Sequence, residues 1–199
     1  MKKTFIVIGL SDAQEPWLDP KALDAISKAK VFSGGKRHHE IMKGLLPKDY
    51  KWIDITVPLA KVFEQYRETF NSQFIVVFAS GDPLFFGFAN TILREMPDAE
   101  IQLFPSFNSL QTLAHRILIP YQDMRIVSLT GRPWHEFDKA LIERAPKMGV
   151  LTDNKVHTPN SIAQRMLEYG YDQYIMWVGE HLGNPSEERI RSEEHTSEL

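Results

Sequence analysis

Short apolar runs alternate with longer amphipathic segments along most of the chain. The runs are typical of strands buried on both faces, and the amphipathic segments repeat apolar positions at helical spacing. Over residues 59–70, for example, Leu59, Val62, Phe63 and Tyr66 share one helical face. The predicted strands are residues 5–9, 31–32, 52–57, 74–79, 101–104, 125–129, 148–151 and 174–178. The predicted helices are residues 20–30, 39–46, 59–70, 88–96, 109–117, 135–144 and 159–169.

This alternation predicts an α/β protein whose sheets are covered by helices on both faces. Residues 119–123 interrupt the pattern, which then restarts, so we expect two α/β domains, at 1–118 and 124–190. The second domain has few predicted strands, so we expect its C-terminal part to be truncated. Residues 191–199, RSEEHTSEL, resemble the translation of a common sequencing-library adapter. We expect them to be a non-native tail, with a disordered acidic tail as the alternative.

Composition narrows the class of protein. The 43% hydrophobic and 25% charged residues are ordinary for a soluble globular protein, and the net charge of −3 offers no global attraction for nucleic acid or anionic membrane. The absence of cysteine excludes disulfides, thiolate metal sites and a cysteine nucleophile. The N-terminal apolar run is too short for a signal peptide, and no segment has the length of a membrane span. We expect a cytoplasmic enzyme or binding protein.

The loop SGDPLFFG, residues 80–87, follows the most apolar of the predicted strands. Gly81 permits a backbone conformation or a close approach that a side chain would block. Pro83 fixes its own φ and biases Asp82 toward an extended conformation, which holds the carboxylate at the end of the strand. Such a carboxylate can accept hydrogen bonds from hydroxyl or ammonium groups. The alternative is that Asp82 only caps the following helix.

Other predicted strands also end in polar loops, where open α/β sheets bind ligands. The loop at Gly9 lacks the GxGxxG pattern of dinucleotide-binding proteins. PSFNS, residues 105–109, can grip a polar ligand or serve only as a helix cap. SGGKRHH, residues 33–39, and TGRPWH, residues 130–135, carry cationic side chains that suit a polyanionic ligand, or a solvated basic loop. The adjacent histidines lack the spacing of metal ligands, so no metal site is predicted.

These loops together resemble the tetrapyrrole (corrin/porphyrin) methylase family and, within it, the CbiE-type branch that methylates C5 of a precorrin in cobalamin biosynthesis. The matching stretches occur in family order and span nearly all of residues 5–190. They are SGGKRHHEIM, FASGDPLFFG, PSFNSLQTLAHR, IVSLTGRPW, LTDNKVHTP and VGEHLGNPSEERI. The resemblance implies two α/β domains, S-adenosylmethionine bound between them, and a homodimer. A CbiT-type C15-methyltransferase is implied as a partner or fused module.

The resemblance also carries functional residues over to this chain. The implied S-adenosylmethionine contacts are Gly81, Asp82, Leu84, Phe85, Asn108, Ser109, Leu129, Thr130, Leu151, Gly179 and Glu180. The side chains expected to pair with the carboxylates of a precorrin are Lys36, Arg37, His38 and Arg132. The catalytic group is unknown, and the candidate proton acceptors are His38, His39 and His135.

Two alternatives to precorrin methylation stay open. The first is a methyltransferase of the same fold that acts on another acceptor, as diphthine-synthase-like or ribosomal-RNA methylases do. The second is a corrinoid-binding module that transfers no methyl group. The basic segment at residues 36–39 and the loop at 130–134 favour the corrinoid branch.

Overall fold

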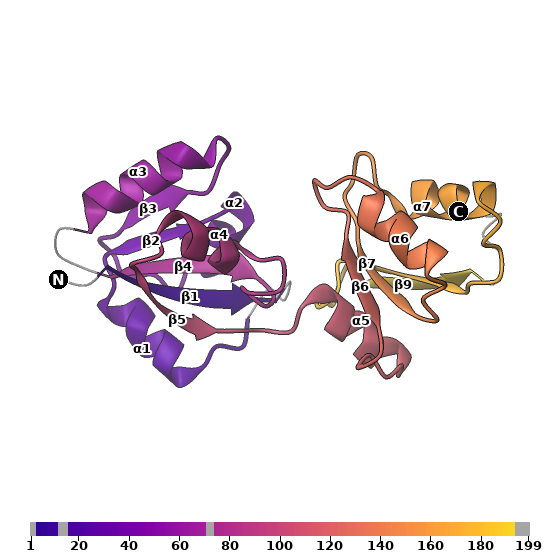
Figure 1. Cartoon of the computed structure of the whole chain (residues 1–199). Helices are drawn as coiled ribbons and strands as arrows, with labels where there is room; N and C mark the ends of the chain where they lie inside the picture. Colours follow the sequence, from indigo (N-terminus) through magenta and orange to yellow (C-terminus); the bar gives the residue numbers. More distant parts are fainter. Residues whose placement is uncertain (1–2, 12–15, 71–73, 194–199) are drawn as a thin grey trace. The chain divides into compact units, whose positions relative to one another are not determined.

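The structure, a computed structural model, describes residues 3–11, 16–70 and 74–193. The chain divides into two compact units, Met1–Asn108 and Ser109–Leu199. Figure 1 shows helices and strands in both units, which follow the chain from indigo to yellow. The predicted α/β fold class is confirmed, because strands and helices alternate in the predicted order.

The N-terminal unit is built around a five-stranded parallel sheet with the strand order β3-β2-β4-β1-β5. Its strands are β1 Thr4–Leu10, β2 Val31–Gly34, β3 Lys51–Asp54, β4 Ile75–Ser80 and β5 Glu100–Phe104. Its helices are α1 Pro20–Lys28, α2 Lys36–Met42, α3 Leu59–Thr69 and α4 Phe88–Glu95. Parallel strands buried on both faces explain why the central runs are apolar throughout.

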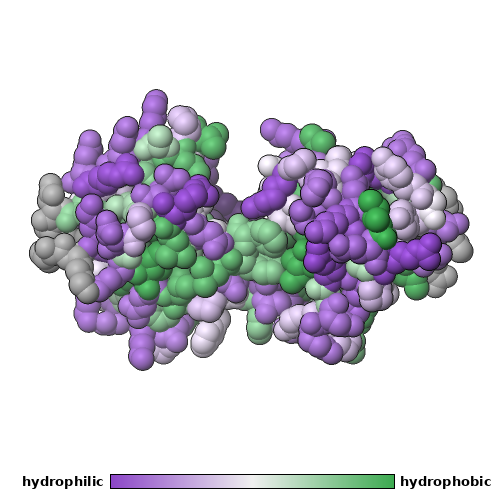
Figure 2. Space-filling view, viewed as in Figure 1, coloured by the Kyte–Doolittle hydropathy of each residue, from purple (hydrophilic) through white to green (hydrophobic). Residues whose placement is uncertain are grey.

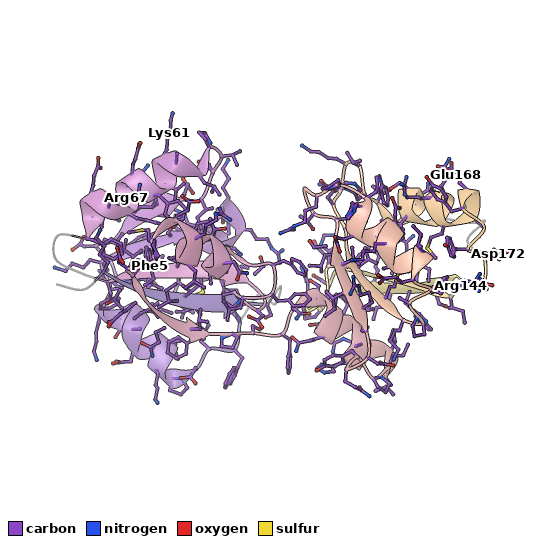
Figure 3. All side chains as sticks on the ribbon, viewed as in Figure 1. Phe5, Lys61, Arg67, Arg144, Glu168 and Asp172 are labelled. Atoms are coloured by element: carbon purple, nitrogen blue, oxygen red, sulfur yellow. The ribbon has the colours of Figure 1, made fainter. Side chains whose placement is uncertain are left out.

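Helices cover both faces of this sheet, as predicted. One buried cluster packs α3 and α4 against Phe5 and Val77, and the other packs α1 and α2 against Ile8 and Phe78. Figure 1 shows α1 and α3 on opposite sides of the strands. In Figure 3, Phe5 lies within the unit, whereas the exposed Lys61 on α3 extends away from the sheet. In Figure 2 the visible surface over α3 is mostly hydrophilic.

The order of the strands creates a point where the chain reverses direction across the sheet. The connections from β1 to β2 and β3 use α1 and α2 on one face, and those from β3 to β4 and β5 use α3 and α4 on the other. The neighbouring strands β1 and β4 therefore continue into helices on opposite faces. A crevice that suits ligands forms at the carboxyl ends of such strands.

The C-terminal unit contains two smaller sheets. One is the parallel pair β6 Arg125–Ser128 and β7 Met148–Leu151, and the other is the antiparallel pair β8 Met176–Glu180 and β9 Arg189–Glu193. Its helices are α5 Ser109–Ile117, α6 His135–Ile142 and α7 Pro159–Glu168. Val127, Phe137 and Ile162 are among the buried residues that join β6, α6 and α7 in one core.

Three sequence expectations need correction. The boundary between the units lies after Asn108 rather than at 119–123, so α5 belongs to the C-terminal unit. The reason is packing, since α5 places Leu110 against Gly149 of β7 and Leu113 against Gly179 of β8. Helix α2 begins at Lys36 instead of residue 39, which makes the basic segment helical.

The third correction concerns the predicted tail. Its first three residues, 191–193, belong to β9, which pairs with β8. The other residues of the predicted tail, 194–199, lie outside the described part of the chain.

Candidate functional site

Three loops at the carboxyl edge of the N-terminal sheet are joined by backbone hydrogen bonds. The N–H of Gly81, directly after β4, donates to the carbonyl of Leu10 at the end of β1, at 2.7 Å. The N–H of Ser106, after β5, donates to the carbonyl of Gly81 at 3.2 Å. Gly81 thus ties the ends of the three adjacent strands β4, β1 and β5 into one surface.

Two glycines make this close approach possible. A Cβ at Gly9 would lie 1.9 Å from the carbonyl oxygen of Gly81 and 2.8 Å from the nitrogen of Ser106. Gly81 has a positive φ of 60°, and a Cβ there would lie 3.0 Å from Cα of Asn108 and 3.1 Å from the carbonyl oxygen of Phe107. Because these neighbours are backbone atoms, a side chain at either glycine would force the loops apart.

Asp82 shapes the loop that follows Gly81. Its Oδ1 accepts a hydrogen bond from the N–H of Leu84 at 2.9 Å, and its carbonyl accepts from the N–H of Phe85 at 3.0 Å. The cap of α4 is Gly87, so the alternative that Asp82 caps this helix is wrong. The carboxylate is half-buried, and among the described residues no other group is bonded to Oδ2.

Apolar side chains surround this carboxylate. Leu84 and Phe86 are 46% and 45% exposed, and Phe86 adopts a positive φ of 53°. The side chain of Asn90, on α4, holds the loop by donating to the carbonyl of Leu84 at 2.8 Å. Figure 2 shows hydrophobic residues gathered on the visible face of the N-terminal unit around α4 and β1. The edge therefore offers both a fixed acceptor and apolar area for a flat ring.

Asn108 lies directly beside Gly81. It is a buried polar residue, 8% exposed, at the end of the N-terminal unit. Ser109, its predicted companion, begins α5 in the C-terminal unit. The structure thus brings Gly81, Asp82 and Asn108 together, as the resemblance implied, by packing two loops of the same sheet edge against each other.

The basic segment supplies side chains to the same edge. Lys36 and Arg37 begin α2 and are exposed. The ring of His38 lies 3.0 Å from the hydroxyl of Ser80, the last residue of β4. Sequence analysis missed Ser80, because its partner is 42 positions away along the chain and no local pattern links them.

His39 points into a different environment. Its Nε2 lies 2.7 Å from the hydroxyl of Tyr50, and its ring stacks on Trp52 with the centroids 4.1 Å apart. These contacts make His39 part of the packing between α2 and β3. It is therefore a weaker candidate for proton transfer than the sequence predicted.

In the C-terminal unit, three predicted residues meet at the ends of β6 and β7. The N–H of Leu129 donates to the carbonyl of Leu151 at 2.8 Å, and the hydroxyl of Thr130 donates to the carbonyl of Thr152 at 3.0 Å. Leu129 is fully buried, so its side chain belongs to the core. Thr130 and the backbone of the two loops remain at the edge.

Arg132 and His135 follow in the same loop. The Arg132 guanidinium folds back onto its own turn, donating to the Ser128 hydroxyl at 2.9 Å and to the Thr130 carbonyl at 3.3 Å. Both printed acceptors are neutral oxygens, which an anionic ligand can displace. His135 is exposed and lies 3.1 Å from Glu136, the residue that follows it.

Gly179 and Glu180 lie on β8, away from the loops after β6 and β7 in sequence. A Cβ at Gly179 would lie 2.9 Å from Leu182 and 3.0 Å from Leu113, so this glycine allows α5 to pack closely. Glu180 forms an ion pair with Arg191 of β9 at 3.1 Å. The structure does not bring these two side chains to the Thr130 loop by any printed contact.

A further pair, Asp153 and His157, was not predicted as a site. Oδ2 of Asp153 lies 2.8 Å from Nδ1 of the buried His157 ring, and Oδ1 accepts from three backbone N–H groups. The N–H of His157, followed by its ring and then the N–H groups of Val156 and Lys155, holds the pKa of Asp153 well below its usual range. The pair stabilises the loop between β7 and α7.

Two searches bear on other classes of function. Within the described residues, no group of three His, Asp or Glu side chains is placed to hold a metal ion. The same part of the chain contains no helix with the length and apolarity needed to cross a membrane.

Comparisons with known proteins identify similar chains. A precorrin-6Y C(5,15)-methyltransferase [decarboxylating] from Sinorhizobium sp is 31% identical over 91% of this chain, which spans only 43% of that relative's length. A cobalt-precorrin-7 C(5)-methyltransferase from Salmonella typhimurium is 28% identical over 91% of this chain and 86% of its own length.

Solved structures share the fold. The precorrin-6Y methylase cbiE from Archaeoglobus fulgidus superposes with a TM-score of 0.65 at 17% identity, covering 99% of this chain and 91% of its own. A uroporphyrin-III C-methyltransferase from Thermus thermophilus, complexed with S-adenosylhomocysteine, gives 0.66 at 19% identity, covering 98% and 84%. The profile described as Tetrapyrrole (Corrin/Porphyrin) Methylases matches residues 4–196, and the chain therefore belongs to the tetrapyrrole (corrin/porphyrin) methylase family.

Proposed function

We propose that this chain is an S-adenosylmethionine-dependent methyltransferase that methylates C5 of a precorrin, precorrin-6Y or cobalt-precorrin-7, in cobalamin biosynthesis. Family membership supports methyl transfer to a tetrapyrrole. The names of the Sinorhizobium and Salmonella relatives support C5 of a precorrin as the acceptor. The observation that carries the proposal is the joined carboxyl edge, where Asp82 is fixed beside Gly81 and Asn108.

The proposed donor site includes this edge. Asp82 offers Oδ2 to the ribose hydroxyls or the ammonium group of the donor, and its charge favours a nearby sulfonium. The exposed Leu84 and the half-buried Phe85 offer apolar surface to the adenine ring. The remaining proposed contacts are Gly81, Asn108, Ser109, Leu129, Thr130, Leu151, Gly179 and Glu180.

The proposed substrate site is cationic. A precorrin carries acetate and propionate carboxylates around its ring, and Lys36, Arg37, His38 and Arg132 are the side chains proposed to pair with them. Lys36 and Arg37 are exposed on α2, at the same sheet edge as Asp82. An anionic macrocycle would therefore meet positive charge next to the donor.

The residues of the chain act mainly by positioning the reactants. S-adenosylmethionine, when bound, supplies a methyl group already activated on a sulfonium. The site has to hold C5 of the macrocycle close to that methyl group and in line with its carbon–sulfur bond. A proton then leaves the methylated ring system. Of the predicted acceptors, His38 and His135 are better placed than His39, whose ring is engaged by Tyr50 and Trp52.

The assembly and location of the protein are also proposals. We infer a homodimer in the cytoplasm from the family resemblance. The Sinorhizobium relative is named for both C5 and C15, and this chain spans 43% of its length. We infer that methylation at C15 belongs to a CbiT-type partner or fused module.

The donor site is tested by removing the charge of Asp82. Asp82→Asn keeps an oxygen that can accept from the N–H of Leu84, so the loop is retained while the negative charge is lost. We expect its affinity for S-adenosylmethionine, measured by calorimetry, to fall by about tenfold or more, the value of one charge-assisted hydrogen bond. Asp98→Asn, at an exposed turn, is the matched control.

Unchanged donor affinity in Asp82→Asn would remove this carboxylate from the site. Methylated ribosomal RNA or a methylated protein would favour the other acceptors of the same fold. Tetrapyrrole binding without methyl transfer would favour a corrinoid-binding module.

A further inference from the structure

A hydrogen bond between His38 and Ser80 joins α2 to the end of β4. Nε2 of His38 lies 3.0 Å from Oγ of Ser80. Ser80 directly precedes Gly81 and Asp82, so the bond lies at the edge that we propose as the donor site. Ser80 is exposed and His38 is half-buried, which leaves the hydroxyl accessible to a ligand.

The other ring nitrogen of His38 indicates which partner donates. The backbone N–H of Gly35 donates to Nδ1 of His38 at 3.3 Å. A ring nitrogen that accepts a hydrogen bond carries no proton, so the proton of the neutral ring is assigned to Nε2. His38 then donates to Ser80, and the hydroxyl of Ser80 must direct its own hydrogen elsewhere.

The free direction of this hydroxyl faces no described protein partner. Among the residues that the structure describes, His38 is the one group bonded to the Ser80 hydroxyl. Lys36 and Arg37 precede His38 on the same helix and are exposed. A hydroxyl donor beside two cationic side chains suits an anionic oxygen, and a carboxylate is such a group.

We propose that Ser80 donates a hydrogen bond to a carboxylate of the bound tetrapyrrole, and that His38 is a positioning residue that fixes the direction of this donor. The inference rests on the proposed function, which supplies a ligand with several carboxylates. It also changes the task of His38. Both ring nitrogens are engaged, so His38 acts through Ser80 instead of removing a proton from the substrate.

The test measures binding of two stable corrinoids to the full chain by calorimetry. Cobyrinic acid has carboxylate side chains, and cobinamide has amides in most of these positions. The variants are Ser80→Ala, His38→Ala, the double variant and His38→Gln, whose amide N–H can replace Nε2–H. Ser27→Ala, on the exposed face of α1, is the matched control. Affinity for S-adenosylhomocysteine is measured for every variant.

We expect Ser80→Ala to bind cobyrinic acid about tenfold more weakly, as for the loss of one hydrogen bond to a charged group. Affinity for cobinamide and for S-adenosylhomocysteine should be unchanged. His38→Ala should lose no more than Ser80→Ala, the double variant should equal Ser80→Ala, and His38→Gln should recover most of the affinity. Such non-additivity is the mark of a residue that acts through its partner.

Two results would overturn the inference. One is wild-type affinity for cobyrinic acid in Ser80→Ala, and the other is a double variant that loses the sum of the two single losses. Methyl transfer by the wild-type chain is assayed alongside. If the wild type transfers methyl groups while Ser80→Ala binds normally, the inference fails and the proposed function stands. If the wild type binds neither corrinoid and transfers nothing, both fail.

Discussion

At the residue scale, backbone geometry around Gly81 organises the candidate site. This one glycine accepts a positive φ, bonds to the ends of two neighbouring strands and leaves room for Asn108. The sequence identified Gly81 as a position where a side chain would interfere. It could not identify the atoms with which a side chain would collide, because these come from the loop after β5.

Gly81→Ala tests this packing. A non-glycine residue at positive φ costs about 1–3 kcal/mol, and the new Cβ would also press on the backbone at Phe107 and Asn108. We expect a loss of stability of at least this size in urea unfolding, together with loss of S-adenosylmethionine binding. Gly44→Ala is the control, since a Cβ there meets nothing within 4 Å. Equal stability of the two variants would show that the loops do not pack as described.

Asp153 gives a prediction about pH. Its pKa is lowered, first by the backbone N–H of His157, so the ionised carboxylate stabilises the folded state. This contribution is complete above the unfolded pKa of about 4 and is lost as the pH falls toward the lower folded pKa. We expect Asp153→Asn to be less stable than the wild type at pH 7 and the difference to shrink below about pH 4. A difference independent of pH, in denaturant unfolding, would contradict the assignment.

At the element scale, the sequence predicted the individual helices and strands better than their neighbours. Asp19 caps α1, with its carboxylate accepting from the N–H of Lys21 at 2.7 Å, and Pro20 begins the helix as predicted. The strand order β3-β2-β4-β1-β5 was not predicted, because apolar runs do not specify which strands pair. The bond between Ser80 and His38 depends on that order, so it was not predicted either.

The start of α2 shows the same limit. The glycines before Lys36 indicated a loop, whereas the structure begins the helix directly after Gly35. Helical geometry then separates neighbours in the sequence. His38 reaches Ser80 at the sheet edge, and His39 stacks on Trp52. The sequence listed both histidines as equal candidates, since adjacency alone does not reveal their different directions.

A test at this scale concerns the contact between α6 and α7. The guanidinium of Arg165 donates two hydrogen bonds of 2.7 Å to Asp138 and stacks over Trp134 at 4.7 Å. Lysine cannot reproduce this planar, two-pronged contact. We expect Arg165→Lys to reduce the free energy of unfolding by about 1 kcal/mol. Arg125→Lys, whose nearest carboxylates lie 3.9 Å away, should change it little, and equal effects would argue against the contact.

At the scale of the whole molecule, the alternation of elements predicted the α/β class, and the ordered motifs predicted the family. The boundary between the units was less accessible. Residues 119–123 look like a linker in sequence, but α5 packs its leucines against Gly149 and Gly179, beyond that break. Contacts between distant positions therefore decide the boundary, and composition does not record them.

The central claim is methyl transfer to C5 of a precorrin. The most direct measurement supplies the full chain with S-adenosylmethionine labelled with ¹³C in the methyl group and with precorrin-6Y or cobalt-precorrin-7. The product is examined by mass spectrometry and ¹³C NMR. We predict one labelled methyl group per macrocycle, at C5. Label at another carbon, or an unlabelled macrocycle in the presence of enzyme that binds both ligands, would contradict the account.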